Sequence, residues 1–355
     1  MAEPIPAPGG SVVEGSPPPP FPFILGVQRS GTTLLRAMFA AHPDVAIPDE
    51  ATFLLGMCRR TNSYETSSGF DLDAFVDDLI HGPAWWHSLP EAEVRGAIRR
   101  ARPETFSDAI RALYRHVAAN EGKTRYGDKT PNALGIMPVL AHLLPEARFI
   151  HIIRDGRDVA LSHVARQTPD EWFIESVGEV ALTWSAAVDG GRRTGGRLGR
   201  RYREVRYESL IDDPEAVLRP LCEFIELPFD RGMLRYHERP KEVLGVTQRD
   251  LDFHEGLYLA PTKGLRDWRR QMPRRDLELF EAIAGRTLEE LGYERGVASV
   301  PLAARARAQF LRANVAAKRA VSGRLQRYSW WSRVRVARHW LLGPRSRPGA
   351  PDRRS

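Results

Sequence analysis

The stretch Gly26–Leu35 reads GVQRSGTTLL and follows an apolar run that begins at Phe21. Its two glycines, five residues apart, match the start of a phosphate-binding P-loop, in which lysine and then Ser or Thr come next. Thr32 and Thr33 stand at those positions, so the lysine typical of ATP-hydrolysing proteins is missing. The stretch predicts a strand, a glycine loop and a helix over 32–41 with a threonine of the N-capping type.

Apolar runs suited to strands alternate with stretches of helical spacing. The expected strands are 21–27, 44–47, 147–153 and one from about Arg203 that contains RYESL; the expected helices are 32–41, 71–80, 91–100, 105–119, about 134–144, one from Arg154, and 213–225. Such alternation is typical of a parallel sheet with helices on both faces. We therefore predict an α/β fold, a P-loop-like parallel sheet in a single domain, with a helical insertion over 54–123.

The composition is that of a folded protein without a metal or disulfide motif. The 355 residues are 42% hydrophobic, enough for one large domain with appendages. Cys58 and Cys222 are far apart and belong to no CxxC or Cys/His cluster, so we expect buried thiols and no metal.

The amino terminus, residues 1–20, is rich in proline and lacks the basic start and continuous apolar run of a signal peptide. No later segment has 18 or more consecutive apolar residues, so we expect no spanning helix. These observations favour a disordered arm and a cytoplasmic protein.

The net charge of +7 is concentrated near the carboxyl terminus. Residues 301–355 hold 14 Lys plus Arg and one acid, Asp352, so residues 1–300 carry a net −6. We therefore distinguish a domain over 21–296 from a basic tail over 297–355. The tail sequence RYSWWSRVRVARHWLLG suits peripheral contact with an anionic membrane, at its inner face. A helix packed on the domain explains it equally well, and nucleic acid is a weaker alternative because the main body is acidic.

Three groups of basic residues follow predicted strands, where parallel sheets bind ligands. Arg29 lies in the glycine loop, whose N–H groups and following helix attract anions. Arg154 and Ser162 are eight residues apart after the strand 147–153. The third group, in TKGLRDWRR, is Lys263, Arg266, Arg269 and Arg270 beside Gly264. Together they indicate a ligand with phosphate at more than one place, although each group could also be a solvated charged surface.

In this order, the motifs resemble those of the sulfotransferases that use 3′-phosphoadenosine 5′-phosphosulfate (PAPS). QRSGTTLL is similar to the family's 5′-phosphosulfate loop, FIHIIRDGRDVALS to its 3′-phosphate segment, and TKGLRDW to its late lysine-glycine loop. The resemblance covers about 21–293. It implies transfer of a sulfuryl group from PAPS, as co-substrate and without a metal, to an acceptor hydroxyl.

The resemblance also implies a role for each matching position. Arg29, Ser30, Gly31, Thr32 and Thr33 would hold the 5′-phosphate and the sulfuryl group, Arg154 and Ser162 the 3′-phosphate, Tyr207 would lie near the adenine, and Lys263 with Gly264 would close over the cofactor. Asp155 and Arg157 would be structural supports.

Within the family, RSGTTLLRAMFAAHPDVAIPDE is most similar to the protein-tyrosine sulfotransferases and to bacterial enzymes that share their loop. That likeness implies a general-base glutamate at Glu50 and a catalytic lysine at Lys129. Glu50 would take the acceptor's proton, while Arg29, Lys129 and the loop N–H groups stabilise charge on the bridging oxygen. The acceptor stays open among carbohydrate, lipid-linked, peptide tyrosine and metabolite hydroxyls. The insertion, with Trp85 and Trp86, would form its pocket.

Two other classes share these features. A P-loop nucleotide kinase would have the same sheet, but it needs a lysine at position 32 and carboxylates for Mg²⁺. A non-catalytic nucleotide-binding membrane adaptor would use the basic tail as its working part.

Overall fold

The computed structural model describes residues 18–81, 89–165, 176–239, 243, 259–261 and 266–328. Some sequence predictions concern residues outside these ranges, and they stay predictions. These residues are 1–17 of the proline-rich arm, Trp85 and Trp86 of the insertion, the pair Lys263 and Gly264, and the aromatic part of the tail from 329 onward.

A parallel sheet forms the centre of the fold. Its strands β1 (Phe21–Gly26), β6 (Asp128–Lys129), β7 (Ala147–Ile153) and β8 (Tyr202–Arg206) lie in the order β6-β1-β7-β8. All three pairings are parallel, and β1 pairs with β7 over its whole length. Every residue of β1 is buried, which explains its continuous apolar sequence. The predicted α/β fold is confirmed.

A short strand, β2 (Val45–Ala46), extends this arrangement. It pairs in parallel with β5 (Arg125–Tyr126), and one residue, Gly127, separates β5 from β6. The Gly127 amide donates to the carbonyl oxygen of Ala46 over 2.8 Å. A Cβ at Gly127 would come within 3.0 Å of the Pro22 carbonyl oxygen. The glycine thus allows one segment to pair with both β2 and β1.

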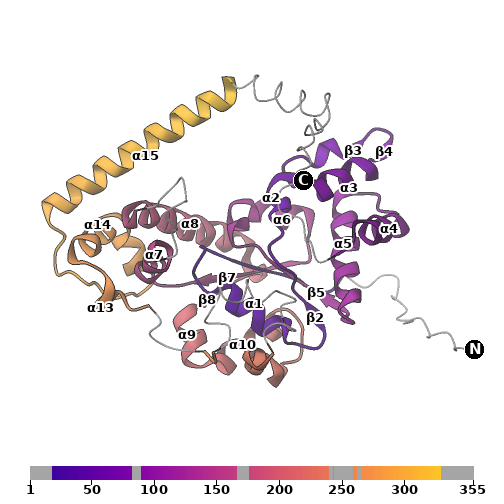
Figure 1. Ribbon diagram of the computed structural model, residues 1–355, viewed down its shortest axis with the longest axis horizontal. Helices are drawn as coiled ribbons and strands as arrows, with labels where there is room; N and C mark the ends of the chain where they lie inside the picture. The colour runs from indigo at the N-terminus through magenta and orange to yellow at the C-terminus, as the bar shows by residue number, and fades with distance from the viewer. Residues whose placement is uncertain are drawn as a thin grey trace, which may run out of the picture.

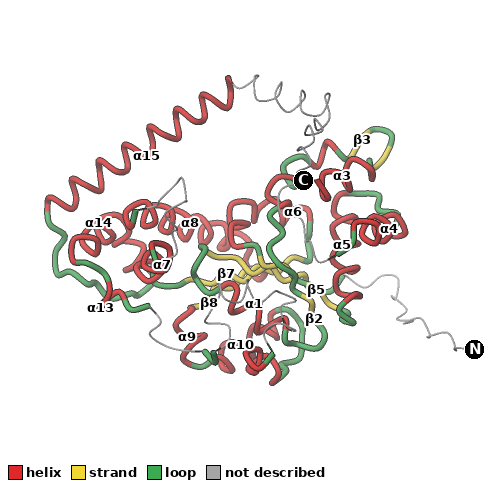
Figure 2. The backbone as a smooth tube through the Cα atoms, in the orientation of Figure 1, coloured by secondary structure: helices red, strands yellow, loops and turns green. Residues whose placement is uncertain are grey.

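Helices cover both faces of the sheet (Figures 1 and 2). One face carries α1 (Thr32–Ala40), α9 (Tyr207–Asp212), α10 (Pro214–Phe224) and the 3-10 helix η4 (Arg231–Glu238), which share a core with Ile24, Ile150 and Ile152. The other face carries η2 (Pro131–Ile136), α6 (Met137–Leu143) and the insertion, which share a core with Phe21, Phe23 and Phe149.

The insertion is helical over most of its described length. It consists of α2 (Phe53–Met57), η1 (Thr61–Ser63), the strand pair β3 (Glu65–Thr66) and β4 (Gly69–Phe70), α3 (Leu72–His81), α4 (Glu91–Ala101) and α5 (Phe106–Asn120). The three longer helices match the predicted ranges closely. At α5 the Thr105 hydroxyl caps the helix by accepting from the Asp108 amide.

A third cluster of helices surrounds the carboxyl end of β7. It includes α7 (Gly156–Val164), α8 (Val177–Leu198), α13 (Trp268–Gln271) and α14 (Arg274–Glu290), with η3 (Gly199–Arg201) between α8 and β8. The last helix, α15 (Leu302–Tyr328), buries Ala304 and Ala308 and contacts α14 and α8. The start of the tail at 297 is therefore a change in composition, and the chain stays packed on the domain beyond it.

Two local predictions are wrong. Thr32 does not cap α1: the N-cap is Gly31, whose φ of 96° is unfavourable for threonine, and no side chain caps the helix there. Tyr207 does not lie in a strand, because β8 ends at Arg206 and Tyr207 is the first residue of α9.

Candidate active site

The glycine loop connects β1 to α1 through an unusual backbone. Arg29 and Gly31 have φ values of 70° and 96°. A Cβ at Gly31 would collide with the ring of Tyr207, so the loop needs glycine for both conformation and space. This tight turn delivers the amino terminus of α1, with its unpaired N–H groups, to the carboxyl end of β1.

Arg154 directly follows β7 and lies beside this loop. Its side chain is buried, Nη1 donates to the Arg29 carbonyl oxygen over 3.3 Å, and the guanidinium lies 4.4 Å from the centroid of the Tyr207 ring. Nε is buried and has no partner among the described residues. The ion pair with Asp158 is long, at 4.0 Å. Arg154 is thus held mainly by neutral groups, which leaves its charge available to an anion.

Two hydroxyls lie in the same cluster. Nε of Arg29 donates to Oγ of Ser162 over 3.2 Å. Oγ of Ser30 is buried without a partner among the described residues. Thr32 is buried and Thr33 half-buried in the first turn of α1. The structure therefore brings together the positions to which the resemblance assigns the 5′-phosphosulfate and the 3′-phosphate. We call Arg29, Ser30, Gly31, Arg154, Ser162 and Tyr207 the anion cluster.

A buried network fixes the start of α7 behind Arg154. Arg157 is fully buried and pairs with Asp155 and Glu281, each over 2.8 Å, while its guanidinium lies 3.6 Å from the Trp268 ring. The Trp268 amide donates to Asp158 over 2.9 Å. Burial raises the pKa of Asp158 to about 6, although Arg154 lowers it. Arg157 and Asp155 therefore hold the start of α7 in place, which is the structural role that the resemblance implies for them.

The third basic group, in TKGLRDWRR, is only partly within the described residues. Two of its arginines, Arg269 and Arg270, pair with carboxylates outside the anion cluster. Nε of Arg269 donates to Glu294 over 2.6 Å, and the exposed Arg270 pairs with Asp267 over 3.5 Å. Both side chains lie against surface carboxylates, which agrees with the alternative of a solvated charged surface for these two residues.

Glu50 and Lys129 form an ion pair at the far end of the site. Lys129, on β6, is buried, and its Nζ lies 2.8 Å from Oε1 of Glu50 and 3.5 Å from Oδ1 of Asp49. Arg36, buried in α1, donates to the Ile47 carbonyl oxygen and lies 3.7 Å from Asp49. Burial alone would raise the pKa of Asp49, but Arg36, Lys129 and hydrogen bonds together lower it. We call Arg36, Asp49, Glu50 and Lys129 the carboxylate cluster.

A buried acid lies next to Lys129 in the sequence. Asp128 is fully buried and accepts a hydrogen bond of 2.7 Å from the Tyr114 hydroxyl. Burial raises the pKa of Asp128 to about 6, although Tyr114 and Lys129 lower it. The sequence prediction missed Arg36, Tyr114 and Asp128, because each looks like an ordinary residue in its local context.

Both clusters lie at the carboxyl ends of parallel strands. Arg29 and Arg154 follow β1 and β7, Lys129 ends β6, and Glu50 follows β2. The carboxyl ends of parallel strands are the usual ligand site in such sheets. An anion held by the first cluster and a carboxylate held by the second would allow proton removal beside a bound phosphate or sulfate.

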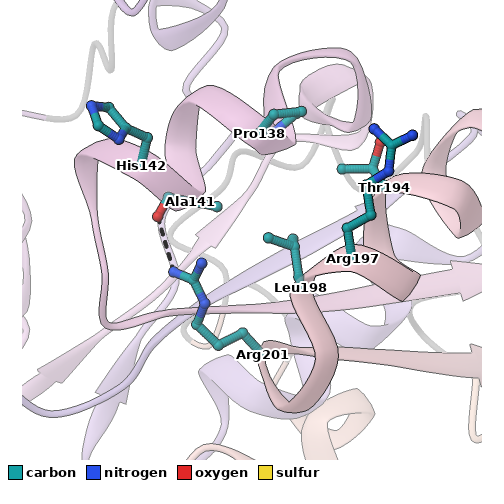
Figure 3. A pocket seen from close by; sticks show the side chains of 7 residues that line it. All are labelled: Pro138, Ala141, His142, Thr194, Arg197, Leu198 and Arg201. Carbon is teal, nitrogen blue, oxygen red and sulfur yellow. Dashed lines mark hydrogen bonds between the residues drawn. The ribbon is translucent and has the colours of Figure 1, made fainter.

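A surface hollow of about 360 Å³ lies elsewhere, between α6 and the end of α8 (Figure 3). Arg201 in its wall donates to the carbonyl oxygens of Ala141 and Pro145, over 2.9 and 3.1 Å. Because Arg201 directly precedes β8, the hollow lies at the amino ends of the strands, away from both clusters. It is therefore not part of the candidate site.

Comparison with known proteins identifies the chemistry. Residues 20–231 match the model of the sulfotransferase family, which is well over half of the chain. The chain belongs to the sulfotransferase family. This sulfotransferase is therefore a transferase enzyme that moves a sulfuryl group to an acceptor. The match includes both clusters, and the kinase alternative is not supported.

Curated relatives are protein-tyrosine sulfotransferases. Protein-tyrosine sulfotransferase 1 of Danio rerio is 26% identical over 280 residues, which cover 78% of this chain and 72% of that protein. Protein-tyrosine sulfotransferase A of Caenorhabditis elegans is 25% identical over 279 residues, 78% of this chain and 67% of that protein. The predicted likeness to this subgroup is confirmed.

Solved structures share the fold. The sulfotransferase domain of the curacin biosynthetic pathway aligns with a TM-score of 0.55 at 20% identity, covering 79% of this chain and 99% of that one. The sulfotransferase domain of the Synechococcus PCC 7002 olefin synthase aligns with a TM-score of 0.53 at 24% identity, covering 79% and 98%.

The prediction of a cytoplasmic location is wrong, and the predicted membrane contact of the tail stays a prediction. The prediction of the location rested on the sequence pattern of residues 1–20 and on the lengths of the apolar runs, whereas the matched relatives are protein-tyrosine sulfotransferases. Within the described residues, no helix of this sulfotransferase is long and apolar enough to cross a membrane. The same residues contain no group of three or more His, Cys, Asp or Glu placed to hold a metal ion.

Proposed function

We propose that this sulfotransferase uses PAPS as its sulfuryl donor and that Glu50 is its general base. The observation that carries the proposal is a pair of buried polar atoms in the anion cluster, Oγ of Ser30 and Nε of Arg154, that have no partner within the part of the chain that the structure describes. Buried polar atoms in a native protein are rarely left without partners, so a ligand with matching acceptors explains them. Phosphate and sulfate oxygens supply such acceptors.

The anion cluster divides the donor's charges between two elements. The N–H groups of the glycine loop and Arg29, Ser30, Thr32 and Thr33 would hold the 5′-phosphosulfate at the amino terminus of α1. Arg154 and Ser162 would hold the 3′-phosphate, and Tyr207, which contacts both the loop and Arg154, would border the adenine. We also propose that Lys263 and Gly264 close over the nucleotide, on the resemblance alone.

The donor supplies a sulfuryl group bound to a good leaving group, a phosphate oxygen. The ion pair with Lys129 holds the Glu50 carboxylate in place. Because the Glu50 side chain is partly exposed, the hydroxyl of an acceptor that enters from solvent can still reach it. In that position the carboxylate can take the hydroxyl proton as the oxygen attacks sulfur. The Lys129 ammonium, together with Arg29, can stabilise the negative charge that grows on the leaving oxygen.

The acceptor pocket would lie between the carboxylate cluster and the insertion. The Ala51 amide donates to Oγ1 of Thr130 over 2.9 Å, which fixes the segment after Glu50 on the segment after Lys129. The helix α2 follows directly and packs against η2. A hydroxyl-bearing substrate is proposed as the acceptor, because a hydroxyl must lose its proton as its oxygen attacks sulfur and Glu50 is placed to take that proton.

Calorimetric binding of adenosine 3′,5′-bisphosphate, the desulfated donor, tests the proposal. We expect tight binding to wild type and a loss of affinity of about 10- to 100-fold in Arg154→Ala, the usual cost of a hydrogen bond to a charged group. Arg148→Ala is the matched control, because Arg148 is on β7 as well but pairs with Glu226 at the opposite end of the strand.

ATP with Mg²⁺ serves as the competing ligand. A preference for Mg·ATP over the bisphosphate would contradict the donor assignment. Equal affinities of Arg154→Ala and Arg148→Ala for the bisphosphate would contradict the role of Arg154. Sulfuryl transfer from labelled PAPS to a panel of phenols, sugars and tyrosine peptides then identifies the acceptor class.

A further inference from the structure

The helix α15 has one side packed on the domain. Ala304 and Ala308 are buried, and Arg312 donates to the carbonyl oxygens of Ala282 and Ile283 in α14. These contacts hold the first half of the helix on the cluster around α8 and α14. Figure 1 shows α15 as the outermost helix of that part of the molecule.

The opposite side of α15 is apolar and exposed. Leu302, Ala306, Phe310, Ala313 and Ala317 are spaced by three or four residues, which places them in one stripe on a helix, and all five are exposed. Among the described residues, Leu302 and Phe310 are the two most exposed large apolar side chains, at 81% and 74%. Exposure of such an apolar stripe to water is unfavourable, so burying it would lower the free energy.

The charge of the helix has a single sign. Its sequence from Leu302 to Tyr328 contains seven basic residues and no Asp or Glu: Arg305, Arg307, Arg312, Lys318, Arg319, Arg324 and Arg327. Arg305 is exposed and Arg307 half-exposed. An apolar stripe accompanied by basic side chains is the pattern of a helix that lies in the plane of an anionic membrane surface.

We propose that α15 docks this sulfotransferase on an anionic lipid bilayer through the stripe Leu302, Ala306, Phe310, Ala313 and Ala317. The apolar side chains would enter the interface between headgroups and acyl chains, while Arg305 and Arg307 contact anionic headgroups. Since the opposite side of the helix is fixed to α14, docking would orient the whole domain relative to the membrane. Any membrane rich in anionic lipid would serve.

Charge favours lipid over the other possible occupants. A second copy of α15 would bring one basic helix against another, and α15 itself contains no Asp or Glu to offset the repulsion, which is unfavourable. Nucleic acid offers the opposite charge, but it provides no apolar layer to cover Leu302 and Phe310. An anionic bilayer supplies both.

Vesicle flotation of the full-length chain tests the proposal. Vesicles contain phosphatidylcholine alone or phosphatidylcholine with phosphatidylserine. We expect binding to the anionic vesicles that falls as salt rises. The variant Leu302→Gln/Phe310→Gln should lower the partition coefficient about tenfold or more, because two large apolar side chains no longer leave water. Arg305→Glu should lower it at least about fivefold.

Val164→Gln is the matched control, because it places the same residue at another exposed apolar position, on α7. It should bind vesicles as wild type does. Since the substituted side chains of α15 are mostly exposed, all variants should keep the wild-type circular dichroism and melting curve.

Several results would overturn the proposal. One such result is flotation of wild type with neither kind of vesicle, or equally with both. Another is flotation of Leu302→Gln/Phe310→Gln to the same extent as wild type. A dimer in sedimentation equilibrium that this variant abolishes, without vesicle binding by wild type, would show that a second copy covers the stripe. Binding of duplex DNA that displaces wild type from vesicles would assign the helix to nucleic acid.

Discussion

The anion cluster and the carboxylate cluster both lie at the carboxyl ends of parallel strands, but their charged side chains are paired to different extents. In the anion cluster, Arg154 is surrounded by a carbonyl oxygen and an aromatic ring, and its ion pair with Asp158 is 4.0 Å long. In the carboxylate cluster, Lys129 contacts two carboxylates directly and Arg36 contacts one of them. Arg154 thus has only a long ion pair, whereas the charges of the carboxylate cluster are paired closely.

This difference indicates how the two halves of the reaction are divided. A site with unbalanced positive charge binds a multiply charged ligand strongly, because the ligand's charge replaces no existing partner. A site whose charges are already paired binds a further anion weakly, and the contact with Lys129 holds the Glu50 carboxylate in place. This difference supports the proposed assignment of the donor to Arg154 and of the acceptor's proton to Glu50. Substitutions that act on one cluster only can break or sharpen this division.

The largest expected effect is on turnover in Glu50→Gln. The amide keeps the shape of the side chain but cannot take a proton, so kcat should fall by about 10² to 10⁴. Bisphosphate affinity should stay within about threefold, because the anion cluster is unchanged. The measurements are sulfuryl transfer to the best acceptor of the panel and calorimetric binding.

Asp49→Asn provides the control for Glu50→Gln. Asp49 contacts the same lysine, but its side chain is 64% exposed and lies farther from Nζ, at 3.5 Å. We expect a small loss of turnover in this variant. A loss as large as that in Glu50→Gln would assign the effect to the charge balance around Lys129, and unchanged turnover in Glu50→Gln would remove Glu50 as the base.

A smaller effect, on stability, is expected in the anion cluster for Gly31→Ala. The new Cβ would adopt φ of 96° and collide with the Tyr207 ring. Strain and overpacking together should lower the free energy of unfolding by about 2 to 4 kcal/mol. Bisphosphate affinity should fall as well, since the loop N–H groups would move. Urea unfolding and calorimetry measure both.

Gly122→Ala separates the cost of backbone strain from the cost of the collision with a neighbouring side chain. Gly122 also has a positive φ, 68°, but nothing lies within 4 Å of its Cβ position. This variant should lose about 1 to 2 kcal/mol, from backbone strain alone. If Gly31→Ala is no less stable than Gly122→Ala, the close packing of Tyr207 on the loop is not needed for the fold.

The sequence was most informative where a motif is local. The strand 147–153 was predicted with the bounds of β7, because a buried parallel strand is apolar along its whole length. The resemblance singled out Glu50 and Lys129, which the structure joins in an ion pair, and their catalytic roles stay proposals.

The sequence was least informative where a residue's role depends on distant partners. Arg36 looks like an exposed helical arginine, but α1 packs it against the segment before Asp49. Arg269 and Arg270 look like part of a basic nest, but α13 turns them toward Glu294 and Asp267. The outcome depended each time on which side of a helix faces the body, and short helices carry too few residues to show this in their spacing.

The smallest expected effect concerns the acid behind the carboxylate cluster. The pKa of Asp128 is about 6 in the folded protein, against an ordinary value of 3.8, so the folded state binds more protons than the unfolded state between those pH values. The free energy of unfolding therefore falls as pH rises from about 4 to about 6, by at most about 3 kcal/mol from this group, and then levels. Asp128→Asn should remove this fall, so its stability relative to wild type should increase with pH over that window. Tyr114→Phe deletes a hydrogen bond that lowers the pKa of Asp128, so the fall should extend to higher pH. Urea midpoints at a series of pH values measure both shifts. Parallel curves for wild type and Asp128→Asn would show that Asp128 is ionised throughout, and that the carboxylate cluster lies beside a permanent buried charge.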